Sequence, residues 1–193
     1  MNSASANASA VATSAVSVSS DTPSTPGLRY HWELLGHYGY DFLSHLFHDE
    51  TKPVREFLSL KVGDAAERTI AITKWRIFFF ALVSGDWNRL HFDSRFAAQT
   101  RFGSPIGHGL ILGGVVSALL GTELPGRGTY YISQAWKFRG PTKIGDDAVV
   151  RVTITSIDSE KRRAVLLTEA RVEGVLVASG EAVVGLDEFP YEK

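Results

Sequence analysis

The sequence predicts an α+β domain, because an apolar helix is followed by a series of strand-like segments. Residues 109–121 are apolar around the whole helical circumference, as expected for a helix that is buried on all sides. Beyond Pro125 and Gly126 the hydrophobic period changes to two, in runs rich in Val, Ile, Thr and aromatic residues at 130–138, 148–157, 163–172 and 175–186. A buried helix followed by an antiparallel sheet is typical of the α+β class.

Turn-forming residues separate the predicted strands, at 139–141, 145–147, 158–161 and 173–174. Upstream of the apolar helix, residues 62–75 predict a turn and a strand, residues 75–86 a short helix, and residues 92–100 a second helical piece. No internal repeat is visible, so residues 59–193 are predicted to form one domain.

The first 58 residues are expected to lie outside this domain. Residues 1–27 hold no Lys or Arg, unlike a secretory signal or a mitochondrial presequence, and their Ala/Ser/Thr-rich composition predicts a disordered tail. Residues 28–58 place aromatic residues and leucines at near-helical spacing, which predicts a helical extension. His45 and His48 are three residues apart in this extension, but a metal site needs at least a third ligand, so no metal is predicted.

The composition excludes several classes of function. The 193 residues include 20 basic and 21 acidic side chains, a balance that favours neither nucleic acid nor an anionic membrane surface. The absence of cysteine excludes disulfides and thiolate nucleophiles and is compatible with a reducing compartment. Residues 102–122 carry no charged side chain, but six glycines and Pro105 argue against a membrane span. We therefore expect a cytoplasmic protein.

One loop combines the side chains needed for acid–base chemistry. In the segment GDWNRLHFDSRFAAQTRFGSPIGHGL, residues 85–110, Asp86, Asn88 and His91 are close in sequence, and Gly109 opens the apolar helix. A carboxylate and an imidazole can exchange protons around one water, while a backbone N–H at a helix N-terminus polarises a carbonyl. Taken singly, the Asp and the Asn fit turn or capping roles, and the His fits a structural role. The combination favours a catalytic site.

These segments resemble the MaoC-like (R)-specific enoyl-CoA hydratases and dehydratases, whose motif reads roughly GDxNPxHxDxxFA followed by PIxHGM or PIxHGL. The resemblance continues through LPGRGTYYISQAWKFRGPTKIGD, residues 124–146, where the family carries LPGxG, a K/RF pair and a P…GD turn. Residues 60–186 can be aligned with the family. The resemblance implies a single hot-dog fold, with the antiparallel sheet wrapped around the helix at 109–121, and a homodimer paired across sheet edges.

The resemblance also implies an activity, the reversible hydration of a trans-2-enoyl-CoA to an (R)-3-hydroxyacyl-CoA. In this interpretation Asp86 and His91 clamp the catalytic water, Asn88 orients the site, and the backbone N–H of Gly109 faces the thioester oxygen. Coenzyme A is part of the substrate, and no metal or other cofactor is expected. Such a hydratase would belong to fatty acid metabolism, where it drains oxidation intermediates toward polyhydroxyalkanoate or feeds a dehydration step in synthesis.

Contacts with the rest of the substrate are less well defined by the sequence. Arg89 stands where the family usually has proline, and it is a candidate for contact with a phosphate of coenzyme A. Further cations near the site are Arg101, Lys137, Arg139 and Lys143, although no spacing singles out a binder. Candidate pocket walls are Trp87, Leu112, Trp136 and Phe138. His108 and Asp93 match positions of the family motif; we expect His108 to support the site structurally and Asp93 to cap the helix that follows it or to support the catalytic residues.

Three alternatives stay open. The substrate can be another acyl thioester, either branched, dicarboxylic or linked to acyl carrier protein. A hot-dog thioesterase would also use an Asp or Glu near the central helix. A non-catalytic acyl-CoA-binding domain would use residues 28–58 to recruit a partner, but such a domain would be expected to have lost the pair formed by Asp86 and His91.

Overall fold

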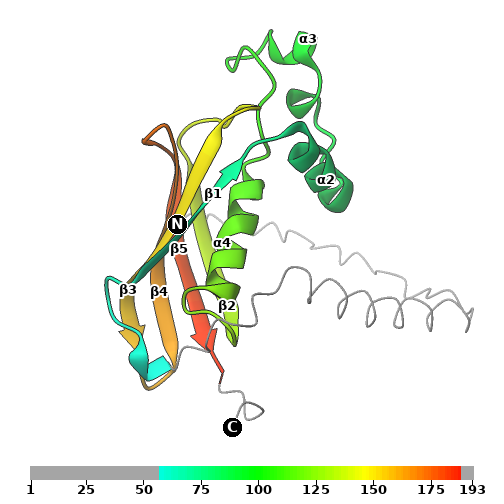
Figure 1. Ribbon diagram of the computed structural model, residues 1–193. Helices are drawn as coiled ribbons and strands as arrows, with labels where there is room; N and C mark the ends of the chain where they lie inside the picture. The colour runs from blue at the N-terminus through cyan, green and yellow to red at the C-terminus, as the bar shows by residue number, and fades with distance from the viewer. Residues whose placement is uncertain (1–56, 188–193) are drawn as a thin grey trace, which may run out of the picture. The chain divides into compact units, whose positions relative to one another are not determined.

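The computed structural model describes residues 57–187 (Figure 1). In this range a short 3-10 turn, η1 (Phe57–Ser59), leads into strand β1 (Ala65–Ala71), helix α2 (Lys74–Ser84), the 3-10 turn η2 (Arg89–His91) and helix α3 (Ser94–Ala97). Helix α4 (Leu110–Thr122) follows, and then strands β2 (Thr129–Phe138), β3 (Asp147–Asp158), β4 (Arg163–Val172) and β5 (Val175–Leu186). The predicted tail at 1–27 and nearly all of the extension predicted at 28–58 lie outside the described residues.

All five strands belong to one antiparallel sheet in the order β1-β3-β4-β5-β2. The predicted α+β class is confirmed, and the strands at 163–172 and 175–186 have the predicted limits. Strands β3 and β4 alternate between buried and more exposed residues along most of their length, which is the period-two pattern of a sheet with one covered face. Among the described residues, no helix is both long enough and apolar enough to span a bilayer.

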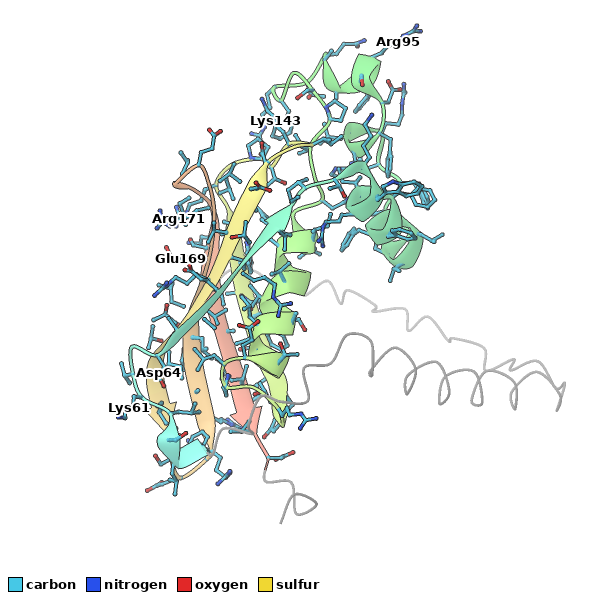
Figure 2. The ribbon with its side chains drawn as sticks, in the orientation of Figure 1. Lys61, Asp64, Arg95, Lys143, Glu169 and Arg171 are labelled. Atoms are coloured by element: carbon cyan, nitrogen blue, oxygen red, sulfur yellow. The ribbon has the colours of Figure 1, made fainter. Side chains whose placement is uncertain are left out.

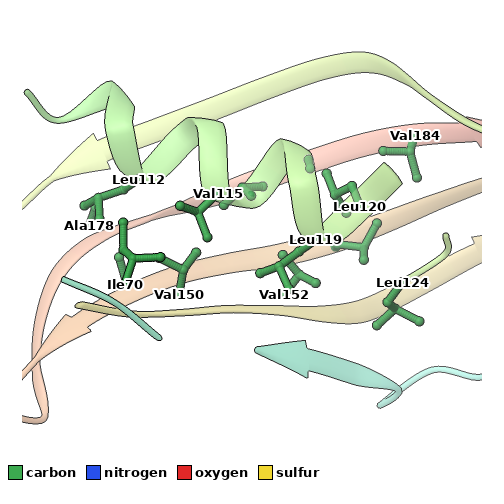
Figure 3. Close-up of a cluster of buried hydrophobic side chains, with 14 of the residues drawn as sticks. Ile70, Leu112, Val115, Leu119, Leu120, Leu124, Val150, Val152, Ala178 and Val184 are labelled. Carbon is green, nitrogen blue, oxygen red and sulfur yellow. The ribbon is translucent and has the colours of Figure 1, made fainter. Parts of the chain in front are cut away.

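Helix α4 packs on one face of this sheet and forms the core with it (Figure 3). Leu112, Leu119 and Leu120 of the helix are almost completely buried. They belong to the same cluster as Val150 and Val152 of β3 and other apolar residues of β4 and β5. Truncating a leucine in such a core costs about 2–5 kcal/mol of stability, so this layer holds the helix that carries Gly109 at its N-terminus.

The prediction that α4 is buried on all sides is wrong for this chain taken alone. Leu110 is 60 % exposed, and Gly114 and Ser117 are exposed as well, because the single sheet covers only one side of the helix. The uniformly apolar sequence of the helix did not reveal which side would face outward.

Helices α2 and α3 lie in the connection between β1 and α4, beyond one end of the sheet (Figure 1). Thr73 caps the start of α2, where its side chain accepts a hydrogen bond from the Arg76 N–H. Gly85 ends the helix in the left-handed conformation with φ 75°, and its N–H donates to the Ala81 carbonyl. This left-handed turn directs the chain into the loop that carries the polar residues.

Candidate active site

The loop after α2 is braced by its own side chains. Asp86 Oδ1 accepts a hydrogen bond from the Asn88 N–H at 3.2 Å, and Asn88 Oδ1 accepts one from the Leu90 N–H at 3.0 Å. Asn88 therefore caps η2, the turn that ends at His91. These local bonds fix the spacing between the carboxylate and the imidazole, and Asn88 acts on the loop conformation.

Asp93 continues this bracing at the start of α3. Its carboxylate accepts hydrogen bonds from the N–H groups of Arg95 and Phe96 at 2.9 and 3.0 Å, so its predicted capping role is confirmed. The hydrogen bond from Arg89, followed by the backbone bond from Phe96, holds the pKa of Asp93 below its ordinary value.

His91 is held by the segment that precedes α4. Its Nδ1 lies 2.8 Å from the Ile106 carbonyl oxygen, which can only accept, so Nδ1 carries the proton. The other ring nitrogen, Nε2, then presents a lone pair in the neutral imidazole, and it lies 4.0 Å from Asp86 Oδ2. The His91 side chain is only 10 % exposed and that of Asp86 is 49 % exposed, so a fixed imidazole faces an accessible carboxylate.

His108 is buried directly behind this pair. Its ring stacks on that of His91, with the centroids 3.7 Å apart and the planes inclined by 29°. His108 Nε2 donates to the Asp86 backbone carbonyl at 3.0 Å, which leaves Nδ1 buried without a hydrogen-bond partner among the described residues. Burial lowers the pKa of His108, against smaller opposing contributions from Asp86, so the ring is neutral.

Gly109 stands at the N-terminus of α4, where backbone N–H groups lack helical partners. Within residues 57–187 its own N–H makes no hydrogen bond, so it is available to an acceptor. A Cβ at this position would lie 2.5 Å from Cε1 of the Phe138 ring. A side chain at position 109 would therefore have to displace the Phe138 ring from the space that it occupies.

A cavity of about 770 Å³ joins these groups. Of the predicted site residues, Asp86, His91, Gly109 and Leu112 line it. The candidate wall residue Phe138 and the candidate cations Arg101, Arg139 and Lys143 also line it, together with Phe80 and Thr142. Phe80 and Thr142 could not be predicted as lining residues because neither belongs to a polar motif. The backbone hydrogen bond from the Gly107 N–H to the Thr142 carbonyl helps to bring Thr142 to the site.

Five other candidate residues are not part of this lining, namely Asn88, Arg89, Lys137, Trp87 and Trp136. The Arg89 guanidinium pairs with Asp93 at 2.7 Å and lies over the Phe96 ring, 4.9 Å from its centroid. These contacts hold the loop where the family has a proline. The i,i+4 spacing of Arg89 and Asp93 could have indicated this ion pair from the sequence.

The two predicted tryptophans also lie elsewhere. Trp87 is half-exposed, between the rings of Phe78 and Phe92. Trp136 is partly buried on β2 and packs against the core. The substrate contacts expected for Arg89, Trp87 and Trp136 stay predictions.

The carboxylate of Asp86 and the rings of His91 and His108 offer atoms that lie within 4.8 Å of one another. Three such groups can hold a metal ion only if their lone pairs converge. The two rings are stacked face to face with their planes inclined by 29°, and His108 Nε2 carries a proton that it donates to a carbonyl. This arrangement suits proton transfer better than metal coordination.

Comparisons with known proteins agree with this architecture. The family model for the MaoC like domain matches residues 61–175. A 3-hydroxybutyryl-CoA dehydratase from Methylorubrum extorquens is 42% identical over 66% of this chain and 82% of that protein. An (R)-specific enoyl-CoA hydratase from Aeromonas caviae is 40% identical over 66% of this chain and 96% of that protein.

The solved structure of the (R)-hydratase from A. caviae, which is involved in PHA biosynthesis, superimposes with a TM-score of 0.65 and 39% identity. The match covers 67% of this chain and 98% of that one. The expected hot-dog fold is confirmed by this likeness together with the packing of the five-stranded sheet on α4. The chain belongs to the MaoC-like dehydratase family.

Proposed function

We propose that this protein catalyses the reversible hydration of a trans-2-enoyl-CoA to an (R)-3-hydroxyacyl-CoA. The observation that carries the proposal is the opposition of Asp86 Oδ2 and His91 Nε2 across 4.0 Å, in the cavity that Gly109 also lines. The two atoms are too far apart for a direct hydrogen bond. One water that makes hydrogen bonds of about 2.8 Å to each would bridge them.

The water held by this pair is the nucleophile. Its oxygen bonds to C3 of the enoyl group while the pair takes up the proton that the water releases, and the pair then delivers a proton to C2. The Asp86–His91 pair thus ends each cycle in its starting protonation state. Because Nδ1 of His91 is committed to the Ile106 carbonyl, proton exchange at this ring takes place at Nε2.

Negative charge develops on the thioester oxygen as C3 is attacked. The Gly109 N–H, at the positive end of the α4 dipole, is the donor that stabilises this charge. His108 stays neutral when His91 takes up a proton, since two charged rings stacked 3.7 Å apart would repel each other strongly. The named activities of the relatives support this assignment, because they act on 3-hydroxybutyryl-CoA and enoyl-CoA.

We also propose that two copies of the chain pair through β2. This strand lies at the edge of the sheet and bonds only to β5 within the described residues. Tyr130, Tyr131 and Ile132 are each at least 40 % exposed. A long apolar edge strand is a template for pairing with another strand, and a second copy offers the same edge.

The activity is tested by incubating the protein with crotonyl-CoA while the enone absorbance and free thiol are followed. The product is then analysed on a chiral column. Loss of absorbance without thiol release, yielding the (R)-alcohol, is the expected result. Release of thiol would identify a thioesterase instead, and tight binding of crotonyl-CoA without turnover would identify a binding domain.

A further inference from the structure

Three cations from two separate connections line the cavity that contains Asp86 and His91. Arg101 lies between α3 and α4, Arg139 follows the end of β2, and Lys143 lies in the loop between β2 and β3. Asp86 is the one carboxylate in the described lining. The wall of the cavity therefore carries an excess of positive charge.

The backbone fixes these two connections against each other. Ile106 and Lys143 form an antiparallel bridge, and the Gly107 N–H donates to the Thr142 carbonyl at 2.7 Å. In Figure 2, Lys143 lies at the end of the sheet nearest to the helical connection, whereas Arg95 on α3 points away from the sheet. Hydrogen-bonded backbone thus holds together the two chain segments that carry the cavity cations. Arg95 is a nearby arginine outside this arrangement.

The side chains of the three cations are not neutralised by carboxylates. Arg139 Nε donates to Ser179 Oγ at 3.0 Å, and the Arg101 guanidinium lies over the Phe102 ring, 4.8 Å from its centroid. In the described part of the chain none of the three forms an ion pair, whereas the cations Arg68, Arg89, Arg151 and Arg171 do. The positive charges on the cavity are therefore available to an anionic ligand.

We infer that Arg101, Arg139 and Lys143 form a phosphate-binding site that selects thioesters of coenzyme A over thioesters on the phosphopantetheine arm of a carrier protein. The inference rests on the proposed hydratase function. Coenzyme A brings a diphosphate and a 3′-phosphate to the mouth of the site, whereas the arm of a carrier protein brings a single phosphodiester. Arginine forks bind phosphate oxygens in pairs, and lysine adds a point charge.

The test compares crotonyl-CoA, crotonyl-4′-phosphopantetheine and crotonyl-pantetheine as substrates. The variants are Arg101→Gln, Arg139→Gln and Lys143→Gln, with Arg95→Gln as the matched control. Each cavity variant is expected to raise KM for crotonyl-CoA about 5- to 30-fold with little change in kcat, because a charge-assisted hydrogen bond to a phosphate of coenzyme A is lost. KM for crotonyl-pantetheine is expected to be unchanged in every variant, and the control is expected to match the wild type on all three substrates.

Two results would overturn the phosphate site while leaving the hydratase intact. One is equal kcat/KM for crotonyl-CoA and crotonyl-pantetheine in the wild type, and the other is an equal effect of the variants on both substrates. A wild type that prefers crotonyl-4′-phosphopantetheine over crotonyl-CoA would overturn the proposed selection of coenzyme A thioesters over carrier-protein thioesters.

If no thioester is turned over, the proposed activity fails, and calorimetric titrations decide the phosphate site independently. Coenzyme A is then expected to bind more tightly than pantetheine, less tightly as salt is added, and about 5- to 30-fold less tightly in the cavity variants. Equal binding of coenzyme A and pantetheine would overturn the site.

Discussion

The imidazoles of His91 and His108 stack with their centroids 3.7 Å apart, although the two residues are separated by the whole of α3 and the loop that follows it. His91 donates through Nδ1 to the Ile106 carbonyl, and His108 donates through Nε2 to the Asp86 carbonyl. Each ring is thus fixed by the segment that carries the other. The stack joins the loop after α2 to the N-terminus of α4.

The buried His108 predicts a loss of stability in mild acid. Burial holds its pKa below the ordinary value of 6.5. The unfolded chain therefore takes up a proton first as the pH falls, and the free energy of unfolding decreases below about pH 6.5 until the folded pKa is passed. Urea unfolding of the wild type at about pH 7.5 and about pH 5.5 measures this decrease.

The variant His108→Gln keeps an amide donor for the Asp86 carbonyl but cannot titrate, so it is expected to lose part of this pH dependence. The carboxyl groups with lowered pKa, Asp93 and Asp158, titrate below their ordinary value of 3.8 and do not contribute in this window. An unfolding free energy with the same pH dependence in wild type and variant would show that His108 is not the group responsible.

Gly109→Ala is expected to reduce activity more than stability. The added methyl group would meet the Phe138 ring at 2.5 Å, and since this ring is 54 % exposed it can swing away at small cost. The displaced ring would disturb the approach of the thioester to the Gly109 N–H, with a rate loss of roughly 10- to 100-fold.

Hydration rates and melting temperatures of Gly109→Ala, Phe138→Leu and the double variant separate the two effects. Partial recovery of the rate in the double variant is expected, because the smaller side chain leaves room for the methyl group. A Gly109→Ala protein with the wild-type rate would argue against the oxyanion role of this N–H.

The sequence predicted the strands and the central helix closely, because their signals are local. Period-two alternation, turn residues such as Gly145 and Gly174, and the charge-free helical segment each define an element without reference to the rest of the fold. The capping of α3 by Asp93 is local in the same sense. The exposure of Leu110 and Ser117 depends on how much of α4 one sheet can cover, which no local pattern contains.

The sequence motif predicted the central pair of the candidate site, but it did not predict which residues from other segments surround that pair. Asp86 and His91 are close in sequence, but the cations Arg101, Arg139 and Lys143 line one cavity because residues 106–107 pair with residues 142–143. The stack of His91 on His108 likewise depends on tertiary structure. Sequence spacing favoured Arg89 as a phosphate contact because of its place in the motif, whereas the folded loop engages it with Asp93.

Pairing through β2 predicts a dimer that a single charge disrupts. Ile132, at the bulged part of this edge strand, is 40 % exposed, and Ile132→Lys would place an ammonium in the proposed interface. Leu167→Lys is the matched control, since Leu167 is equally exposed on the interior strand β4. Sedimentation velocity is expected to give a dimer for the wild type and the control and a monomer for Ile132→Lys. A monomeric wild type would contradict the proposed pairing.

The most direct test of the Asp86–His91 pair is the rate of crotonyl-CoA hydration by the wild type, Asp86→Asn, His91→Ala and the double variant. Asp147→Asn, a change at an exposed carboxylate outside the cavity, serves as the control. Because both residues hold one water, each single change is expected to lower the rate roughly 10²- to 10⁴-fold, and the double variant should be little slower than the slower single variant. A wild type without turnover, or single variants as active as the wild type, would contradict the account.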